Sequence, residues 1–107
     1  MFQKRQFQRY IVRLPVTVRA GGHAIDCTTV RVSRKGFFVR SQRPLISGVP
    51  VELEVTLADA SPCKLRGVVK HTRKSDLMPR MNGMGIEFTQ TDPRFEAFVA
   101  GIERERG

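Results

Sequence analysis

Cysteine is scarce in this sequence, and the two residues that occur, Cys27 and Cys63, lie far apart. Their separation matches neither the paired ligands of a zinc motif nor a C-x-x-C redox pair. Because a free cysteine behaves as a small apolar residue, we expect both to be buried core thiols. A disulfide between them is the alternative, and it would require an oxidising compartment.

Long apolar segments are also missing. No stretch approaches the roughly 20 apolar residues that span a bilayer, and the N-terminus lacks the apolar region of a secretory signal. We therefore expect a cytoplasmic protein without membrane insertion. With 107 residues and an apolar fraction of 40%, the chain is expected to form one domain over residues 1–107 with a single core.

The sequence has no motif of a common catalytic site. It contains neither a P-loop nor a dinucleotide-binding glycine fingerprint, and Ser33 in VSRKG lacks the second glycine of a nucleophile elbow. His23 lies beside a turn and His71 within a strand pattern, so both are expected to be ordinary surface or edge residues. We expect a protein that is not an enzyme and holds neither a metal nor a cofactor.

Acidic residues are nearly absent from the first half of the chain, where Asp26 is the only one among residues 1–51. Residues 52–107 hold nine basic and nine acidic side chains, so the net charge of +9 arises in the first half. Ten basic residues produce it: Lys4, Arg5, Arg9, Arg13, Arg19, Arg31, Arg34, Lys35, Arg40 and Arg43. Clustered cations indicate an anionic partner, although a merely soluble basic face has the same composition.

Apolar and polar residues alternate in several short segments, which is the period of a strand with one buried face. The predicted strands are residues 11–20, residues 23–33, a strand that starts at about Gly36, residues 49–57, residues 62–73, and a segment with Met84, Ile86 and Phe88 on one face.

The segments between these strands carry turn signals. Gly21-Gly22 predicts a two-residue hairpin turn. The alternation slips between Cys27 and Val30, so we expect a β-bulge near Thr28-Thr29. Residues 74–82 are expected to form an exposed loop.

A helix is predicted for residues 92–104. Asp92 and Pro93 suit the N-cap and the first helical position. One side of the helix is apolar and should pack onto the sheet, through Phe95, Phe98, Val99 and Ile102. The expected fold is dominated by β-structure: a small six-stranded antiparallel β-barrel over residues 11–90, with a C-terminal α-helix and a flexible basic arm at residues 1–10.

Two basic segments carry ligand-binding chemistry. Arg5 and Arg9 are separated by three residues ahead of the first strand, and guanidinium groups grip phosphate oxygens or guanine through a planar fork of donors. The second segment, RVSRKGFF, begins at Arg31; Ser33 offers a hydroxyl there, and Gly36 allows a close approach of the backbone. Taken singly, the two segments are a basic tail and a turn.

Together and in this order they resemble the PilZ domain family of cyclic di-GMP receptors, which carries R-x-x-x-R followed by D/N-x-S-x-x-G. Arg5 and Arg9 match the first motif, whereas Ser33 and Gly36 match the second. Arg31 stands where the family has Asp or Asn. The alternation of residues 49–57 and the GMGIEF stretch extend the resemblance toward the end of the chain.

The resemblance implies that Arg5 and Arg9 hold the phosphates and guanine faces of cyclic di-GMP, while Ser33 and the Gly36 turn support the base. An Asp or Asn oxygen accepts hydrogen bonds from guanine, whereas Arg31 has donors only, so that contact is lost. The loss costs about 1 to 3 kcal/mol. Attraction of the two phosphates to Arg31, Arg34 or Lys35 would offset part of it, and Lys4, beside Arg5, is a candidate for holding a second ligand molecule.

Three functions follow, with an unidentified protein partner in the first two. The leading hypothesis is a cyclic di-GMP receptor or adaptor in which the ligand orders the basic arm and changes a protein-interaction surface. The second is a degenerate PilZ-like adaptor that no longer binds nucleotide. The third is a barrel that binds single-stranded nucleic acid, which is not the expected partner because the aromatic spacing fits no known RNA motif.

Overall fold

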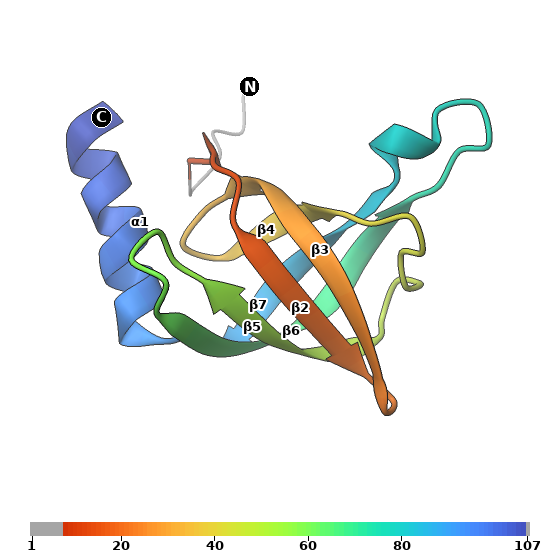
Figure 1. Ribbon diagram of the computed structural model, residues 1–107, viewed down its shortest axis with the longest axis horizontal. Coiled ribbons are helices and arrows are strands. Elements are labelled where there is room, and N and C mark those ends of the chain that lie inside the picture. The colour runs from red at the N-terminus through yellow and green to blue at the C-terminus, as the bar shows by residue number, and fades with distance from the viewer. Residues whose placement is uncertain (1–7, 107) are drawn as a thin grey trace, which may run out of the picture.

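The computed structural model describes residues 8–106. Within these residues the chain forms seven strands, a short 3₁₀ helix and one α-helix (Figure 1). In chain order these are β1 (Tyr10–Ile11), β2 (Pro15–Ala20), β3 (His23–Val32), β4 (Gly36–Arg40), β5 (Pro50–Thr56), β6 (Pro62–Arg73), η1 (Pro79–Met81), β7 (Gly83–Gln90) and α1 (Pro93–Arg106).

All strand pairings are antiparallel, and six strands close into a barrel in the order β3-β2-β5-β6-β7-β4, with β4 pairing back onto β3. The two-residue strand β1 is added to β3 outside this ring. The predicted six-stranded antiparallel barrel with a C-terminal helix is therefore confirmed. Closure leaves no long edge strand unpaired.

The predicted strand at residues 11–20 is divided into β1 and β2. Between them, the buried hydroxyl of Thr29 accepts a hydrogen bond from the Leu14 amide at 2.8 Å and donates one to the Val12 carbonyl at 2.6 Å. The Thr29 side chain thus adds to two backbone hydrogen bonds in this segment, from the Val12 amide to the Val30 carbonyl and from the Thr29 amide to the Leu14 carbonyl. The alternation of apolar residues persists through the break, because it depends only on which side of the chain faces the core.

The predicted bulge lies one step beyond the expected position. The pairing of β3 with β4 shifts between Thr29 and Arg31, so Val30 is the extra residue. The hairpin turn is where the sequence places it, since Gly21 and Gly22 both have positive φ angles, of 55° and 81°. The alternation of β3 therefore changes side after Thr29, which directs Arg31 outward.

The inward-facing residues of the strands form one core together with the inner side of α1. Cys27 and Cys63 are buried there as free thiols, as predicted, and burial raises the pKa of both. The ring of Phe95 on α1 makes edge-to-face contacts with Phe37 and Phe88, at centroid distances of 6.1 and 5.4 Å. These contacts confirm that α1 packs onto the sheet.

Asp92 begins the helix as predicted. Its Oδ1 accepts a hydrogen bond from the Arg94 amide at 2.8 Å, and its carbonyl accepts one from the Glu96 amide at 3.0 Å. The helix extends to Arg106 rather than ending at residue 104. Within the described part of the chain, no helix is long and apolar enough to cross a membrane.

The segment at residues 74–82 differs from a simple exposed loop. It contains η1 and ends at Asn82, which is buried. The side-chain oxygen of Asn82 accepts a hydrogen bond from the Ser75 amide at 2.7 Å. The Asn82 carbonyl also accepts one from the Ser41 amide at 3.0 Å. Asn82 therefore links the two ends of this segment to each other and to Ser41, which follows β4. The sequence did not predict these links.

Candidate ligand-binding site

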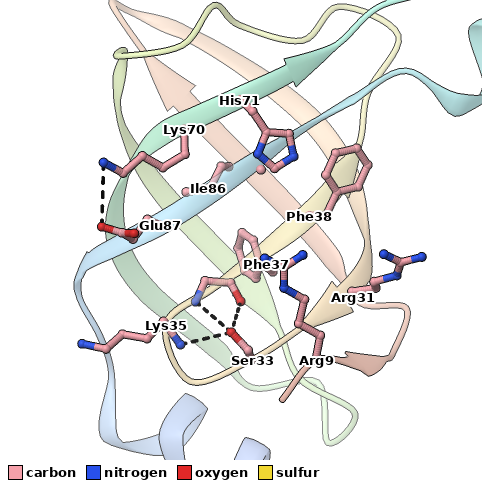
Figure 2. Close-up of a pocket in the computed structure, with 12 residues that line it drawn as sticks. Arg9, Arg31, Ser33, Lys35, Phe37, Phe38, Lys70, His71, Ile86 and Glu87 are labelled. Atoms are coloured by element: carbon pink, nitrogen blue, oxygen red, sulfur yellow. Dashed lines mark hydrogen bonds and ion pairs between the residues drawn. The ribbon is translucent and has the colours of Figure 1, made fainter. Parts of the chain in front are cut away.

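The short strand β1 fixes the position of Arg9. Tyr10 lies opposite Val32 and Ile11 lies opposite Arg31, and the Tyr10 side chain is only 7% exposed. Because Tyr10 is anchored in the core, the preceding residue is held at the surface beside Arg31. Figure 2 shows both arginine side chains at the same side of the site. The sequence named these two residues separately, and the β1–β3 pairing brings them together.

Ser33 builds the turn between β3 and β4. Its hydroxyl accepts hydrogen bonds from the amides of Lys35 and Gly36, both at 3.2 Å, and donates one to the Gly36 carbonyl at 3.1 Å (Figure 2). A hydroxyl has one donor and two acceptor positions, so all of them are engaged. Ser33 is 6% exposed and shapes the turn that borders the site.

Gly36 is required by a close approach of two strands. A Cβ at this position would lie 2.1 Å from the carbonyl oxygen of Ile86 in β7, which no side chain tolerates. Gly36 is not among the glycines with positive φ. The absence of a side chain, rather than a left-handed conformation, explains glycine here.

Aromatic and glycine residues continue the site along the outer face. Gly85 lies opposite Phe38 in β4 and opposite His71 in β6. The rings of Phe38 and His71 stack with a centroid distance of 5.7 Å and an interplanar angle of 20°. A Cβ on Gly85 would meet the imidazole at 2.2 Å, so this glycine makes room for it. The guanidinium of Arg73 lies 5.4 Å from the centre of the Phe38 ring.

His71 is exposed, as predicted for a surface residue. It also lines the candidate site, which the sequence did not predict. A bulge between Val69 and His71 in β6 turns its ring outward over Gly85. Gly83 and Gly85 occupy alternate positions of the GMGIEF stretch in β7. Glycines inside a strand indicate that a side chain from a neighbouring strand lies over them.

These elements surround a pocket of about 160 Å³. The lining residues with ligand-binding chemistry are Arg9, Arg31, Ser33, Gly36, Phe38 and His71. Lys35, Lys70 and Glu87 line one side of the pocket (Figure 2). A second pocket, of about 130 Å³, shares Arg9, Arg31, Phe38 and His71 and adds Arg40, Arg73 and Met81. The two pockets form one continuous surface, because they share four lining residues that matter for binding.

This surface is strongly basic. Within residues 8–106, Glu87 is the one acidic residue that lines either pocket. None of the three salt bridges found among these residues involves Arg9, Arg31 or Arg40. Uncompensated guanidinium groups beside aromatic rings suit a ligand with both phosphates and flat bases.

One predicted site residue, Arg34, lines neither pocket. Arg34 points to the C-terminal helix, where its Nε donates hydrogen bonds to both carboxylate oxygens of Glu103 at 2.9 and 3.1 Å. This hydrogen bonding and the charge of Glu103 raise the pKa of Arg34. Lys4 and Arg5 lie outside the described residues. Among residues 8–106, no group of His, Cys, Asp or Glu side chains is arranged to hold a metal ion.

The fold and the site define a small barrel domain with a basic, aromatic-lined surface on its outer face. A model of the PilZ domain family matches residues 3–102, and the chain therefore belongs to the PilZ family. The structure is similar to that of the inhibitor of motility (MotI/DgrA) of Bacillus subtilis, with a TM-score of 0.81 and 18% sequence identity. This similarity covers 98% of the chain and 52% of the Bacillus chain, so the present chain spans about half of that protein.

No curated protein matches the chain. Family membership nevertheless defines a general class of activity, since PilZ domains are binding and adaptor domains rather than enzymes. It also agrees with the resemblance read from Arg5, Arg9, Ser33 and Gly36 in the sequence.

Proposed function

We propose that this domain is a receptor for cyclic di-GMP that passes the binding signal to a protein partner. The observation that carries the proposal is the convergence of Arg9, Arg31 and the Ser33–Gly36 turn on one pocket. These residues come from two motifs that lie far apart in the sequence. Membership of a family of cyclic di-GMP receptors supports the same ligand.

In the proposed complex, one guanine enters the pocket and the phosphates lie across the basic surface. The pocket of about 160 Å³ has room for one flat base, not for a whole dinucleotide. Arg9 and Arg31 border both pockets, so their guanidinium groups reach a phosphate between them. Arg5 is the second arginine of the proposed phosphate grip.

We assign Arg34 a different role from the one expected from the sequence. Its bond to Glu103 joins the motif turn to α1, and Arg106 of the same helix donates a hydrogen bond to the Ile11 carbonyl at 3.1 Å. The helix therefore contacts the segments on both sides of the site. A ligand that shifts β1 or the turn alters the surface around α1, which is the surface we propose for a protein partner.

The structural neighbour from Bacillus subtilis is named as an inhibitor of motility. From this name we carry only one general property into the proposal, which is that the domain acts on another component of the cell. A protein partner contacting α1 is the form that this action takes in the proposal.

Isothermal titration calorimetry with purified protein tests the proposal, using cyclic di-GMP as ligand and GTP and a short single-stranded oligonucleotide as controls at moderate salt. We expect saturable binding of cyclic di-GMP and none of the controls. Silence toward all three ligands would support the degenerate adaptor instead. Binding of the oligonucleotide, with a steep loss as salt is raised, would support the nucleic-acid-binding barrel.

A further inference from the structure

The site presents many hydrogen-bond donors and few acceptors, although guanine needs acceptors. The Watson–Crick edge of guanine carries two neighbouring donors, the ring N1–H and the exocyclic amino group. The family places an Asp or Asn near this edge, whereas Arg31 of this chain offers donors only. This inference therefore rests on the proposed function and asks which group replaces the missing acceptor.

Ser33 is not that group. Its hydroxyl oxygen already accepts hydrogen bonds from the Lys35 and Gly36 amides, and its proton is directed to the Gly36 carbonyl. Recruiting it to the ligand would open the turn that borders the pocket. The acceptor must come from another strand.

Glu87 in β7 has the required position. It lies directly opposite Gly36 across the β4–β7 ladder, so both residues are on the outer face of the sheet. Because Gly36 has no side chain, nothing from that position stands between the Ser33 turn and Glu87. The Glu87 side chain lines the pocket from the side opposite Arg9 and Arg31 (Figure 2).

The Glu87 carboxylate is also available. Its side chain is 58% exposed, and Lys70 Nζ is 4.0 Å from Oε1, which is at the outer limit of an ion pair. Such an exposed and long pair contributes little to stability. Rearranging it to face a ligand therefore costs little.

We propose that Glu87 supplies the guanine-recognising acceptor that Arg31 lacks, and that it makes the site selective for guanine over adenine. The two oxygens of one carboxylate accept from N1–H and the amino group at once. Adenine has no N1–H, and its N1 lone pair faces a carboxylate unfavourably. The same residue therefore attracts one base and rejects the other.

Substitution of Glu87 tests the inference directly. Glu87→Gln keeps the size of the side chain but replaces one acceptor oxygen with a donor amide. We expect the affinity for cyclic di-GMP to fall by about ten-fold or more, and the ratio of affinities for cyclic di-GMP over cyclic di-AMP to fall with it. Titration calorimetry of both dinucleotides measures both quantities.

Glu52→Gln is the matched control. Glu52 also lies on the outer face of a strand, and it lines neither of the two basic pockets. Its substitution changes the net charge by the same amount, and we expect the affinity for cyclic di-GMP to change by less than about two-fold. A similar loss in both variants would mean that overall charge, not a contact of Glu87, determines binding.

A rescue variant sharpens the test. Adding Arg31→Asp to the Glu87→Gln protein restores an acceptor at the family position but removes the contact of Arg31 with the phosphate. We therefore expect it to recover the selectivity for cyclic di-GMP over cyclic di-AMP rather than the full affinity. If wild-type protein binds cyclic di-GMP and Glu87→Gln binds it equally well, the role of Glu87 is overturned while the receptor function stands. If the wild-type protein itself does not bind, the receptor function fails and this inference fails with it.

Discussion

Two sections of the outer barrel surface arrange their charges in opposite ways. On β2, β5 and the first part of β6, acids alternate with bases across the strands: Glu52 lies between Arg19 and Arg66, and Glu54 lies opposite Lys64. On β3, β4 and β7, the outer positions hold arginines, aromatic rings and glycines, with Asp26 and Glu87 as the acids. We call the first section the balanced face and the second the ligand face.

The difference shows where the net charge of +9 acts. On the balanced face each acid has a base on a neighbouring strand, so the local field is largely cancelled. On the ligand face Arg31 and Arg40 have no acid opposite them in the sheet. Arg31 lies between Ile11 and Phe38, and Arg40 lies between Thr28 and Gly83. A charge that the protein leaves uncompensated is available to an external anion.

The glycines of the ligand face are the most sensitive part of this arrangement. In Gly36→Ala the new methyl would lie 2.1 Å from the Ile86 carbonyl, so β4 and β7 must separate locally. We expect the free energy of unfolding to fall by about 3 kcal/mol, measured by urea denaturation. Gly101→Ala in α1 is the control, because its nearest neighbour would be Arg104 at 3.8 Å. That variant should gain about 0.5 to 1 kcal/mol. Equal stability of both variants would contradict the close approach.

A pair of arginine variants compares the two faces in binding. Arg9→Ala removes a guanidinium shared by both pockets, whereas Arg19→Ala removes one that faces Glu52 on the balanced face. We expect the first to weaken cyclic di-GMP binding by roughly 100-fold and the second by less than about two-fold. Calorimetric titration distinguishes them. Equal losses would show that the two faces do not differ in function.

The start of α1 lies outside both faces and should affect stability alone. Asp92→Ala removes the acceptor of the Arg94 amide, and we expect a loss of about 1 kcal/mol in thermal or urea unfolding, with unchanged ligand binding. Hydrogen bonds from Arg94 hold the pKa of Asp92 below its ordinary value of 3.8. The stabilisation is therefore complete above pH 3.8 and is lost as the pH falls through the lower, folded-state pKa.

Asp92→Asn separates the cap from the charge. The amide oxygen still accepts the Arg94 hydrogen bond, so this variant should lose less stability than Asp92→Ala. It should also lack the part of the acid-induced loss that Asp92 contributes. A pH dependence identical to that of the wild type would contradict the assignment.

The smallest effect is expected on the balanced face. Glu52→Gln leaves Arg19 and Arg66 without the acid between them, and we expect a loss of about 0.5 kcal/mol at low salt that shrinks as salt is added. Glu87→Gln should change stability less, since its contact with Lys70 is long and exposed. Urea denaturation at two salt concentrations measures both. A larger loss from Glu87→Gln would reverse the assignment of the two faces.

Most of the fold could be predicted because each element carries its own local signal. The alternation of residues 62–73 coincides with β6, Gly21-Gly22 with the hairpin, and Asp92 with the start of the helix. The division of residues 11–20 could not be predicted, because it depends on the hydroxyl of Thr29 reaching Val12 and Leu14 from another strand.

The candidate site was predictable only in part. Arg9 and the Ser33–Gly36 turn form recognisable motifs, so the sequence alone identified them. The position of His71 depends on a bulge in β6 and on the room above Gly85. The pairing of Arg34 with Glu103 joins residues 69 positions apart in the chain. Contacts of this kind leave no periodic signal in either segment.

The sequence by itself determined which residues face inward, where the chain turns and where the charge is concentrated, because these depend on neighbouring residues and on period-two alternation. The tertiary structure decided which outward residues become neighbours. It placed Glu87 opposite Gly36, and His71 beside Phe38. The physical reason is register: the pairing of distant strands, shifted by bulges, sets lateral neighbours that no single strand specifies.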